Sequence, residues 1–211
     1  MCIICVSKSG MAQPSADRLS RMFDRNPHGA GYMYARNGVV HIHKGFMDKA
    51  DFLKQIKAEA FTADDAVVYH FRISTQAGVT PAMTHPFPLS TETAHLRALD
   101  IDCPCGIAHN GMISMTSTKH PTMSDTALFI QRYMHRIVRT PDDLHDKRVL
   151  EILQELIGWS KLAILDSSGY IATVGNFTKD DGGILYSNHT YRDIPAKPFP
   201  FKLGSELQHK M

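Results

Sequence analysis

The stretch GYMYARNGVVHIHKG, residues 31–45, carries the clearest structural signal in the sequence. Apolar and polar residues alternate on both sides of Asn37-Gly38, a dipeptide that is preferred in the tight turns of β-hairpins. The stretch KLAILDSSGYIATVGN, residues 161–176, predicts a second hairpin. Because a hairpin joins antiparallel strands, we expect the sheets of this protein to be antiparallel.

Shorter signals complete the predicted strands and helices. Apolar runs predict buried strands at CIICV (2–6), AVVYHFR (66–72), GIAHNGMI (106–113, with a turn in it) and ILYS (184–187). Capping residues and apolar faces predict helices at 15–23, at 48–60, from Ser124 to Val138, and from the cap Thr140 to Ile157. This order of elements indicates an α+β protein whose helices cover the faces of antiparallel sheets.

The bulk composition is that of a globular protein, and it restricts the function. The 211 residues are 43% hydrophobic and 21% charged, with a net charge of +2. No repeat or linker divides them, so we expect one domain over 1–211, with 195–211 as a surface tail. Dispersed charges do not support nucleic-acid or membrane binding, and no apolar run could span a bilayer. Four cysteines and the lack of a signal-peptide pattern predict a cytoplasmic protein without a disulfide framework.

Polar clusters at strand ends, or at a helix start, are the candidate functional residues. They are Cys2, HFRISTQAG (70–78), HNG (109–111) and SDTALF (124–129), with His85 in a loop. Each alone has a simple structural explanation: a buried thiol, a surface cation, a turn or a helix cap. Cys103-Pro104-Cys105 is too closely spaced for a zinc knuckle, and a turn before a strand explains it better.

Together and in this order, these motifs resemble the class II glutamine amidotransferase domain, whose nucleophile is an N-terminal cysteine. The resemblance extends from Cys2 to the helix at 125–138, and NPHGAGYMYA (26–35) is similar to the Asp-Gly-x-Gly segment of such domains. It implies a stand-alone domain with the four-layer αββα sandwich of N-terminal nucleophile (Ntn) hydrolases. The implied reaction converts glutamine to glutamate and ammonia, and a separate acceptor enzyme would use the ammonia.

The resemblance also assigns the catalytic residues. Cys2 would attack the glutamine amide and form a γ-glutamyl thioester, and Asn110 and Gly111 would donate hydrogen bonds to the oxyanion. Removal of Met1 would free the α-amine of Cys2, whose typical pKa of about 7.7–8.0 suits a base that takes the thiol proton. This chemistry needs no metal and no organic cofactor.

Further matches concern the binding of substrate. Arg72 matches the group that binds the α-carboxylate, because a planar guanidinium donates two parallel hydrogen bonds to a carboxylate. Asp125 matches the acid that binds the α-ammonium group. Thr75 and His85 match positions that line the same pocket.

Three other interpretations stay open. A stand-alone member could hydrolyse another γ-glutamyl amide, which a wider pocket around Ile73 and Gln76 would favour. The same fold could be a catalytically silent binding module, which a retained Met1 would favour. A papain-like thiol hydrolase would need a different cysteine beside a histidine, which would be Cys5, Cys103 or Cys105.

Overall fold

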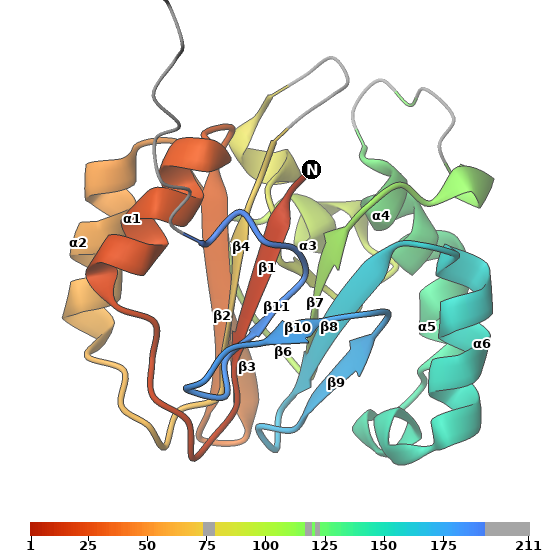
Figure 1. The fold of residues 1–211 in the computed structure, drawn as a ribbon. Coiled ribbons are helices and arrows are strands. Elements are labelled where there is room, and N and C mark those ends of the chain that lie inside the picture. The colour runs from red at the N-terminus through yellow and green to blue at the C-terminus, as the bar shows by residue number, and fades with distance from the viewer. Residues whose placement is uncertain (74–78, 117–119, 121–122, 193–211) are drawn as a thin grey trace, which may run out of the picture.

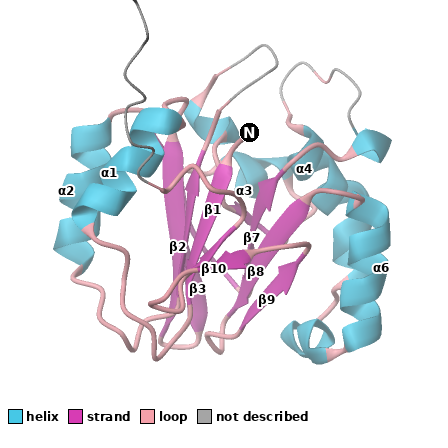
Figure 2. Cartoon of the chain, in the orientation of Figure 1, coloured by secondary structure: helices cyan, strands magenta, loops and turns pink. Residues whose placement is uncertain are grey.

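The computed structural model describes residues 1–73, 79–116, 120 and 123–192. Its strands form two antiparallel sheets, as the hairpin signals predict (Figures 1 and 2). The larger sheet has the order β10-β11-β1-β4-β2-β3-β6, with bounds Thr178–Lys179, Leu185–Tyr186, Ile3–Ser7, Val67–Phe71, Ala30–Arg36, Val39–Phe46 and Asp100–Cys103. The smaller sheet has the order β5-β7-β8-β9, with bounds Phe87–Pro88, Cys105–Asn110, Lys161–Asp166 and Ile171–Val174.

The hairpin over residues 31–45 is confirmed as β2 and β3. Asn37 and Gly38 have φ values of +55° and +77°, and two positive φ values in succession are typical of a type I′ turn. The second predicted hairpin is β8 and β9, which pair from Leu162 with Val174 to Leu165 with Ile171.

Helices lie on the outer faces of both sheets (Figure 1). α1 (Ala16–Arg25) and α2 (Lys49–Glu59) pack on the seven-stranded sheet through residues such as Leu19 and Phe52. The four-stranded sheet is covered by α4 (Asp125–Phe129), a π-helical turn (Ile130–Met134), α5 (His135–Ile137) and α6 (Lys147–Ile157). A short helix, α3 (Thr93–Arg97), precedes β6.

The inner faces of the two sheets share one apolar core. In β1, Ile4 and Val6 face the other sheet, whereas Ile3 and Cys5 face the layer of α1 and α2. A strand that is buried on both faces has a continuous apolar sequence, and this explains CIICV. Further members of the core between the sheets are Met33, Val40, Ile42, Val68, Ala108, Ala163 and Leu165.

Pro104 carries the chain from one sheet to the other. Cys103 ends β6 in the seven-stranded sheet, and Cys105 begins β7 in the four-stranded sheet. The Cys103 thiol donates to the Cys105 carbonyl oxygen, with Sγ and O 3.2 Å apart. The motif is therefore a sharp link between two strands, where the sequence predicts a turn before one strand.

The sequence analysis missed three elements and misplaced one helix start. The missed elements are β5, α3 and β6, which are too short to show a periodic pattern. The helix expected to start at Thr140 is a 3₁₀ turn, Pro141–His145, followed by a separate α6. Asp146 has an extended backbone and its side chain accepts from Arg148 N at 2.9 Å, so this second cap starts the helix anew.

A close approach at Gly31 gives a test of the fold. A Cβ at this position of β2 would lie 2.3 Å from the His85 carbonyl oxygen and 2.7 Å from Lys44 Cβ. Gly31→Ala is expected to lower the free energy of unfolding by about 1–3 kcal/mol, because backbone has to shift to admit the methyl group. Urea denaturation measures this difference.

Gly182→Ala is the matched control. A Cβ at Gly182 would meet only Asp180 Oδ1, at 3.4 Å, so the expected change in stability is below about 0.5 kcal/mol. If the two variants were equally stable, the tight contact at Gly31 would not exist in solution.

Candidate active site

The candidate active site lies where three strands end at one edge of the two facing sheets. β1 and β4 are antiparallel, with Ile4 opposite His70. Cys2 lies two residues before Ile4, and Arg72 lies two residues after His70. Because side chains alternate along a strand, Cys2 is on the same face as Ile4 and Arg72 on the same face as His70. Asn110 is the last residue of β7 in the facing sheet. The strands thus place one thiol, one guanidinium and one amide at the same edge, next to the core residues.

Cys2 is the one cysteine of the chain that is not fully buried. The Ile73 backbone N–H donates to its Sγ at 3.4 Å, and the Ile73 carbonyl oxygen lies 3.6 Å from the same atom. Burial raises the pKa of the Cys2 thiol, while the Ile73 N–H and the Arg72 charge act in the opposite direction. The thiol is therefore protonated at neutral pH and needs a base to become a nucleophile.

Arg72 follows β4, and its backbone is held by the loop after α1. Its N–H donates to the Gly29 carbonyl oxygen at 2.8 Å, and its own carbonyl accepts from His28 N at 2.9 Å. Burial lowers the pKa of the guanidinium, and the Asp125 carboxylate, together with Cys2 when it is a thiolate, acts in the opposite direction. A half-buried guanidinium, with its planar set of donors, suits the binding of a carboxylate.

Asn110 is tied to β1 by a serine from the far end of the chain. Asn110 is 4% exposed, and its Nδ2 donates to Ser187 Oγ at 2.9 Å. The same hydroxyl oxygen accepts from Ile4 N at 2.8 Å. Because the amide nitrogen carries two hydrogens, one remains for a further acceptor at the site.

The turn after Asn110 admits only glycine. Gly111 has a φ of +141°, and a Cβ there would lie 2.3 Å from Ser160 Oγ. The Ser160 hydroxyl also holds the next residue, since it accepts from Met112 N and donates to Met112 O, both at 3.0 Å. The backbone around Gly111 is thus fixed from both sides.

Asp125 begins α4, and backbone N–H groups hold its carboxylate. Oδ2 accepts from Ile113 N at 2.9 Å, and Oδ1 accepts from Thr126 N at 2.8 Å. Ser124 caps the helix by accepting from Ala127 N at 3.2 Å, as its sequence predicts. The Asp125 carboxylate keeps further lone pairs for a cationic partner.

A cluster of three buried histidines lies behind these groups. The ring centroids of His70 and His85 are 4.3 Å apart, and those of His85 and His109 are 6.2 Å apart. Burial lowers the pKa to about 3 for His70, to about 4 for His109, and well below its usual range for His85. All three imidazoles are therefore neutral at pH 7.

The predicted site residues that the structure describes lie in this one region, and they are Cys2, Arg72, His85, Asn110, Gly111 and Asp125. Thr75 lies outside the described residues. His85 is 6% exposed and its Nε2 contacts the Thr126 hydroxyl, so it supports the site from within the protein.

Sequence reasoning missed several residues that hold the site together. Ser187 and Ser160 contact Asn110 and the segment after it, and Asn188 Nδ2 donates to the Cys2 carbonyl oxygen at 2.6 Å. The polar residues after the predicted strand ILYS were the available signal. It was weak, because a contact across more than 180 residues leaves no local pattern.

The other cysteines do not resemble nucleophiles. Cys5, Cys103 and Cys105 are buried, and burial raises the pKa of Cys103 and Cys105 to about 12 and that of Cys5 still further. Within the described residues, no three His, Cys, Asp or Glu side chains are grouped so that they could hold a metal ion. No helix in this part of the chain has the length and apolar character needed to cross a membrane.

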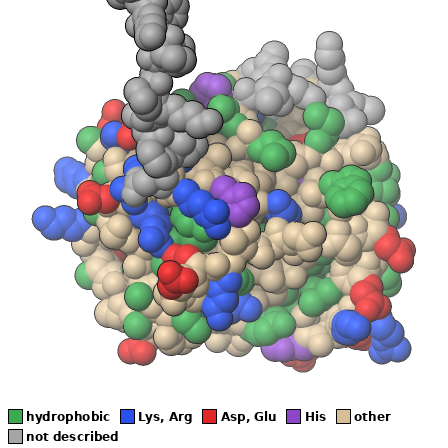
Figure 3. All heavy atoms as spheres, in the orientation of Figure 1, with side chains coloured by type: hydrophobic (Ala, Val, Ile, Leu, Met, Phe, Trp, Pro, Cys, Tyr) green, Lys and Arg blue, Asp and Glu red, His purple; other side chains and the backbone are tan. Residues whose placement is uncertain are grey.

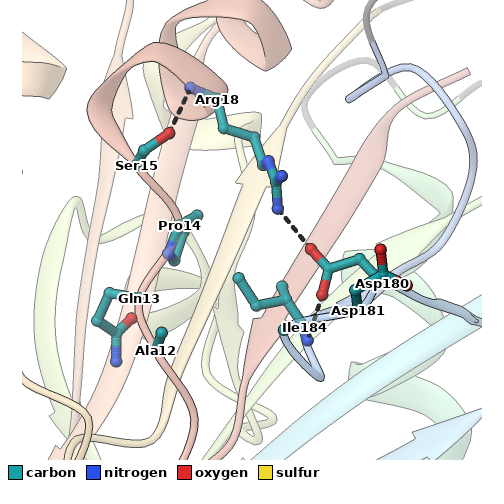
Figure 4. A pocket seen from close by; sticks show the side chains of 9 residues that line it. Ala12, Gln13, Pro14, Ser15, Arg18, Asp180, Asp181 and Ile184 are labelled. Atoms are coloured by element: carbon teal, nitrogen blue, oxygen red, sulfur yellow. Dashed lines mark hydrogen bonds and ion pairs between the residues drawn. The ribbon is translucent and has the colours of Figure 1, made fainter.

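A separate surface hollow of about 330 Å³ lies between the segment before α1 and the turn that joins β10 to β11 (Figure 4). Arg18, at its wall, forms an ion pair with Asp180 and donates to the Tyr186 hydroxyl at 2.9 Å. On the face in Figure 3, positive and negative side chains lie beside one another. Since the Arg18 charge is matched within the protein, we assign this hollow no ligand.

The buried histidines predict that the fold is sensitive to acid. In the unfolded chain their pKa is about 6.5, so below this pH the unfolded chain takes up protons that the folded protein does not. For His70 and His109, the free energy of unfolding should fall as the pH decreases from 6.5 toward 5, by up to about 1.4 kcal/mol per pH unit each. Urea denaturation between pH 7.5 and 5 measures this slope.

His109→Asn keeps a donor near the position of Nδ1 but cannot be protonated, so it should reduce the slope. His95→Asn, at an exposed histidine, is the control and should leave the slope as in the wild type. An unchanged slope in His109→Asn would show that His109 is not held neutral.

No protein-family model and no curated protein matches the chain. Among solved structures it is similar to glutamine phosphoribosylpyrophosphate amidotransferase from B. subtilis in complex with ADP and GMP, with 15% sequence identity and a TM-score of 0.49. The similarity covers 88% of this chain and 41% of that chain, so this chain spans less than half of the other protein's length. The function proposed below therefore rests on the geometry of the side chains.

Proposed function

We propose that the protein is a class II glutamine amidotransferase domain, which hydrolyses the side-chain amide of glutamine to glutamate and ammonia. The observation that carries the proposal is the meeting of Cys2, Arg72 and Asn110 at one edge of two facing sheets. We also propose that the two sheets and their outer helices are the αββα sandwich of Ntn hydrolases, formed by a single domain.

The proposed nucleophile is the Cys2 thiol, after removal of Met1. The freed α-amine takes the thiol proton, and the thiolate attacks the side-chain carbonyl carbon of glutamine. Such a base is needed because burial raises the pKa of the thiol. The tetrahedral intermediate expels ammonia, which leaves with the proton from the amine. Water then hydrolyses the γ-glutamyl thioester and releases glutamate.

The oxyanion of this intermediate would accept hydrogen bonds from Asn110 and Gly111. The free hydrogen of the Asn110 amide supports this role, since the other is used by Ser187. The Gly111 N–H lies in a turn that Ser160 fixes. The donor would therefore need little reorganisation to bind the oxyanion during the reaction.

Arg72 and Asp125 would recognise the amino-acid end of glutamine. The Arg72 guanidinium would bind the α-carboxylate, and the Asp125 carboxylate would bind the α-ammonium group. One cation and one anion beside the nucleophile would select an amino acid. Thr75 is proposed to line the same pocket. A separate synthetase is the proposed acceptor of the ammonia.

Covalent labelling tests the nucleophile and the substrate together. The intact mass is measured before and after exposure to a diazo-ketone analogue of glutamine, which alkylates N-terminal cysteine nucleophiles. We expect a mass without Met1, one added label, protection by glutamine, and no label in Cys2→Ala.

Two outcomes would contradict the proposal in different ways. Processed protein that stays unlabelled, but releases ammonia from another γ-glutamyl amide, would change the substrate and keep the nucleophile. A chain that retains Met1 in its native host would leave Cys2 as a structural thiol at the start of β1.

Asn110→Ala tests the oxyanion donor. We expect kcat for ammonia release to fall by about 10²–10³, with a smaller change in KM, because the hydrogen bond strengthens in the transition state. The exposed residue Asn176 offers a control, and Asn176→Ala should keep wild-type kinetics. An equal effect on kcat and KM in Asn110→Ala would instead indicate a binding role.

A further inference from the structure

The Thr126 hydroxyl makes an unusual set of contacts for a side chain that is 1% exposed. Its Oγ1 lies 2.8 Å from His109 Nδ1, 3.2 Å from His85 Nε2 and 3.4 Å from Asp125 Oδ1. A single buried hydroxyl thus joins the proposed acid for the α-ammonium group to two imidazoles.

The direction of each hydrogen bond follows from proton counting. A hydroxyl has one hydrogen and two lone pairs, and the Asp125 carboxylate can only accept. The Thr126 hydrogen therefore goes to Asp125, and its lone pairs accept from His109 Nδ1–H and His85 Nε2–H. Each neutral imidazole carries one N–H, which this arrangement uses.

The remaining imidazole nitrogens agree with this assignment. Among the described residues, His109 Nε2 and His85 Nδ1 are buried without a hydrogen-bond partner. In the assigned tautomers these are the unprotonated nitrogens, so no buried N–H is left unsatisfied. Burial lowers the pKa of both histidines, which keeps them in these neutral tautomers.

The network also reaches the proposed oxyanion donors. His109 directly precedes Asn110 in β7, and its carbonyl oxygen lies 3.0 Å from His70 Nε2. The hydroxyl of Thr126 therefore connects the start of α4 with the end of the strand that carries the amide.

We propose that Thr126 is a positioning residue. It orients the Asp125 carboxylate for the α-ammonium group of the substrate and fixes the position of this carboxylate relative to β7, the strand that carries Asn110. This inference rests on the proposed function. Because Thr126 is buried, its effect on the substrate would pass through Asp125.

A pair of substrates separates this role from a general effect on folding. Glutaramate is glutamine with hydrogen in place of the α-ammonium group, so it cannot use Asp125. The measured quantity is the ratio of kcat/KM for glutamine to kcat/KM for glutaramate, from ammonia release by protein that lacks Met1. A loss of folded protein lowers both values alike and leaves the ratio unchanged.

Thr126→Val removes the hydroxyl and keeps the shape of the side chain. We expect it to lower the ratio by about tenfold, mainly through a higher KM for glutamine, because one hydrogen bond to a charged group is lost. Thr126→Ser restores the hydroxyl and should recover most of the ratio.

Thr116→Val is the matched control. Thr116 is also fully buried and donates to Asp125, but to its backbone carbonyl oxygen, at 2.8 Å. The hydroxyl does not contact the carboxylate, so the ratio should stay within about twofold of the wild type even if stability falls.

Histidine variants give a second test that does not depend on Thr126. His109→Asn offers an amide N–H near the position of Nδ1, whereas His109→Gln places its amide near Nε2. If Thr126 positions Asp125 as proposed, the ratio should fall below the wild-type value in His109→Gln and should stay near it in His109→Asn.

The outcomes distinguish a failure of the proposed function from a failure of the positioning role. A wild-type protein that hydrolyses neither substrate overturns the proposed function and, with it, this inference. An active wild type whose ratio is the same in Thr126→Val and Thr116→Val overturns the positioning role alone.

Discussion

The packing of the two sheets on one shared core determines where the polar groups of the site can lie. Residues such as Ile4 and Ala108 fill the space between the sheets, and every second residue of a strand points into it. Beyond the edge of the core the same positions hold Cys2 and Asn110. The candidate site is therefore the continuation of the core pattern, and the strands alone bring its main groups together.

Local sequence patterns predicted the elements whose conformation is decided locally. Asn37-Gly38 adopts the two positive φ values that its turn requires, and Ser15 and Asp48 cap the helices that follow them. Cys2 and Arg72 were visible as polar groups at the ends of apolar runs, but only the resemblance to a known family made them predicted site residues.

The parts that sequence reasoning missed depend on partners far away along the chain. β6 is a four-residue strand in which Asp100 and Asp102 alternate with Ile101, and its pairing with β3 defines it. Ser187 contacts Asn110 across 77 residues, so nothing nearby marks it. Thr126 was part of a noted motif, but its contact with two imidazoles follows only from the placement of α4 against β7.

The pairing of β1 with β11 has a consequence for protein synthesis. β1 is synthesised before β11, and Ser187 and Asn188, which contact Ile4 and Cys2, are made more than 180 residues after them. In a nascent chain, Cys2 and Ile4 are therefore made before these partners exist. The candidate site is complete only after residues 187 and 188 have been made, so a chain that stops before residue 187 would hold the Cys2 thiol without the groups that fix it.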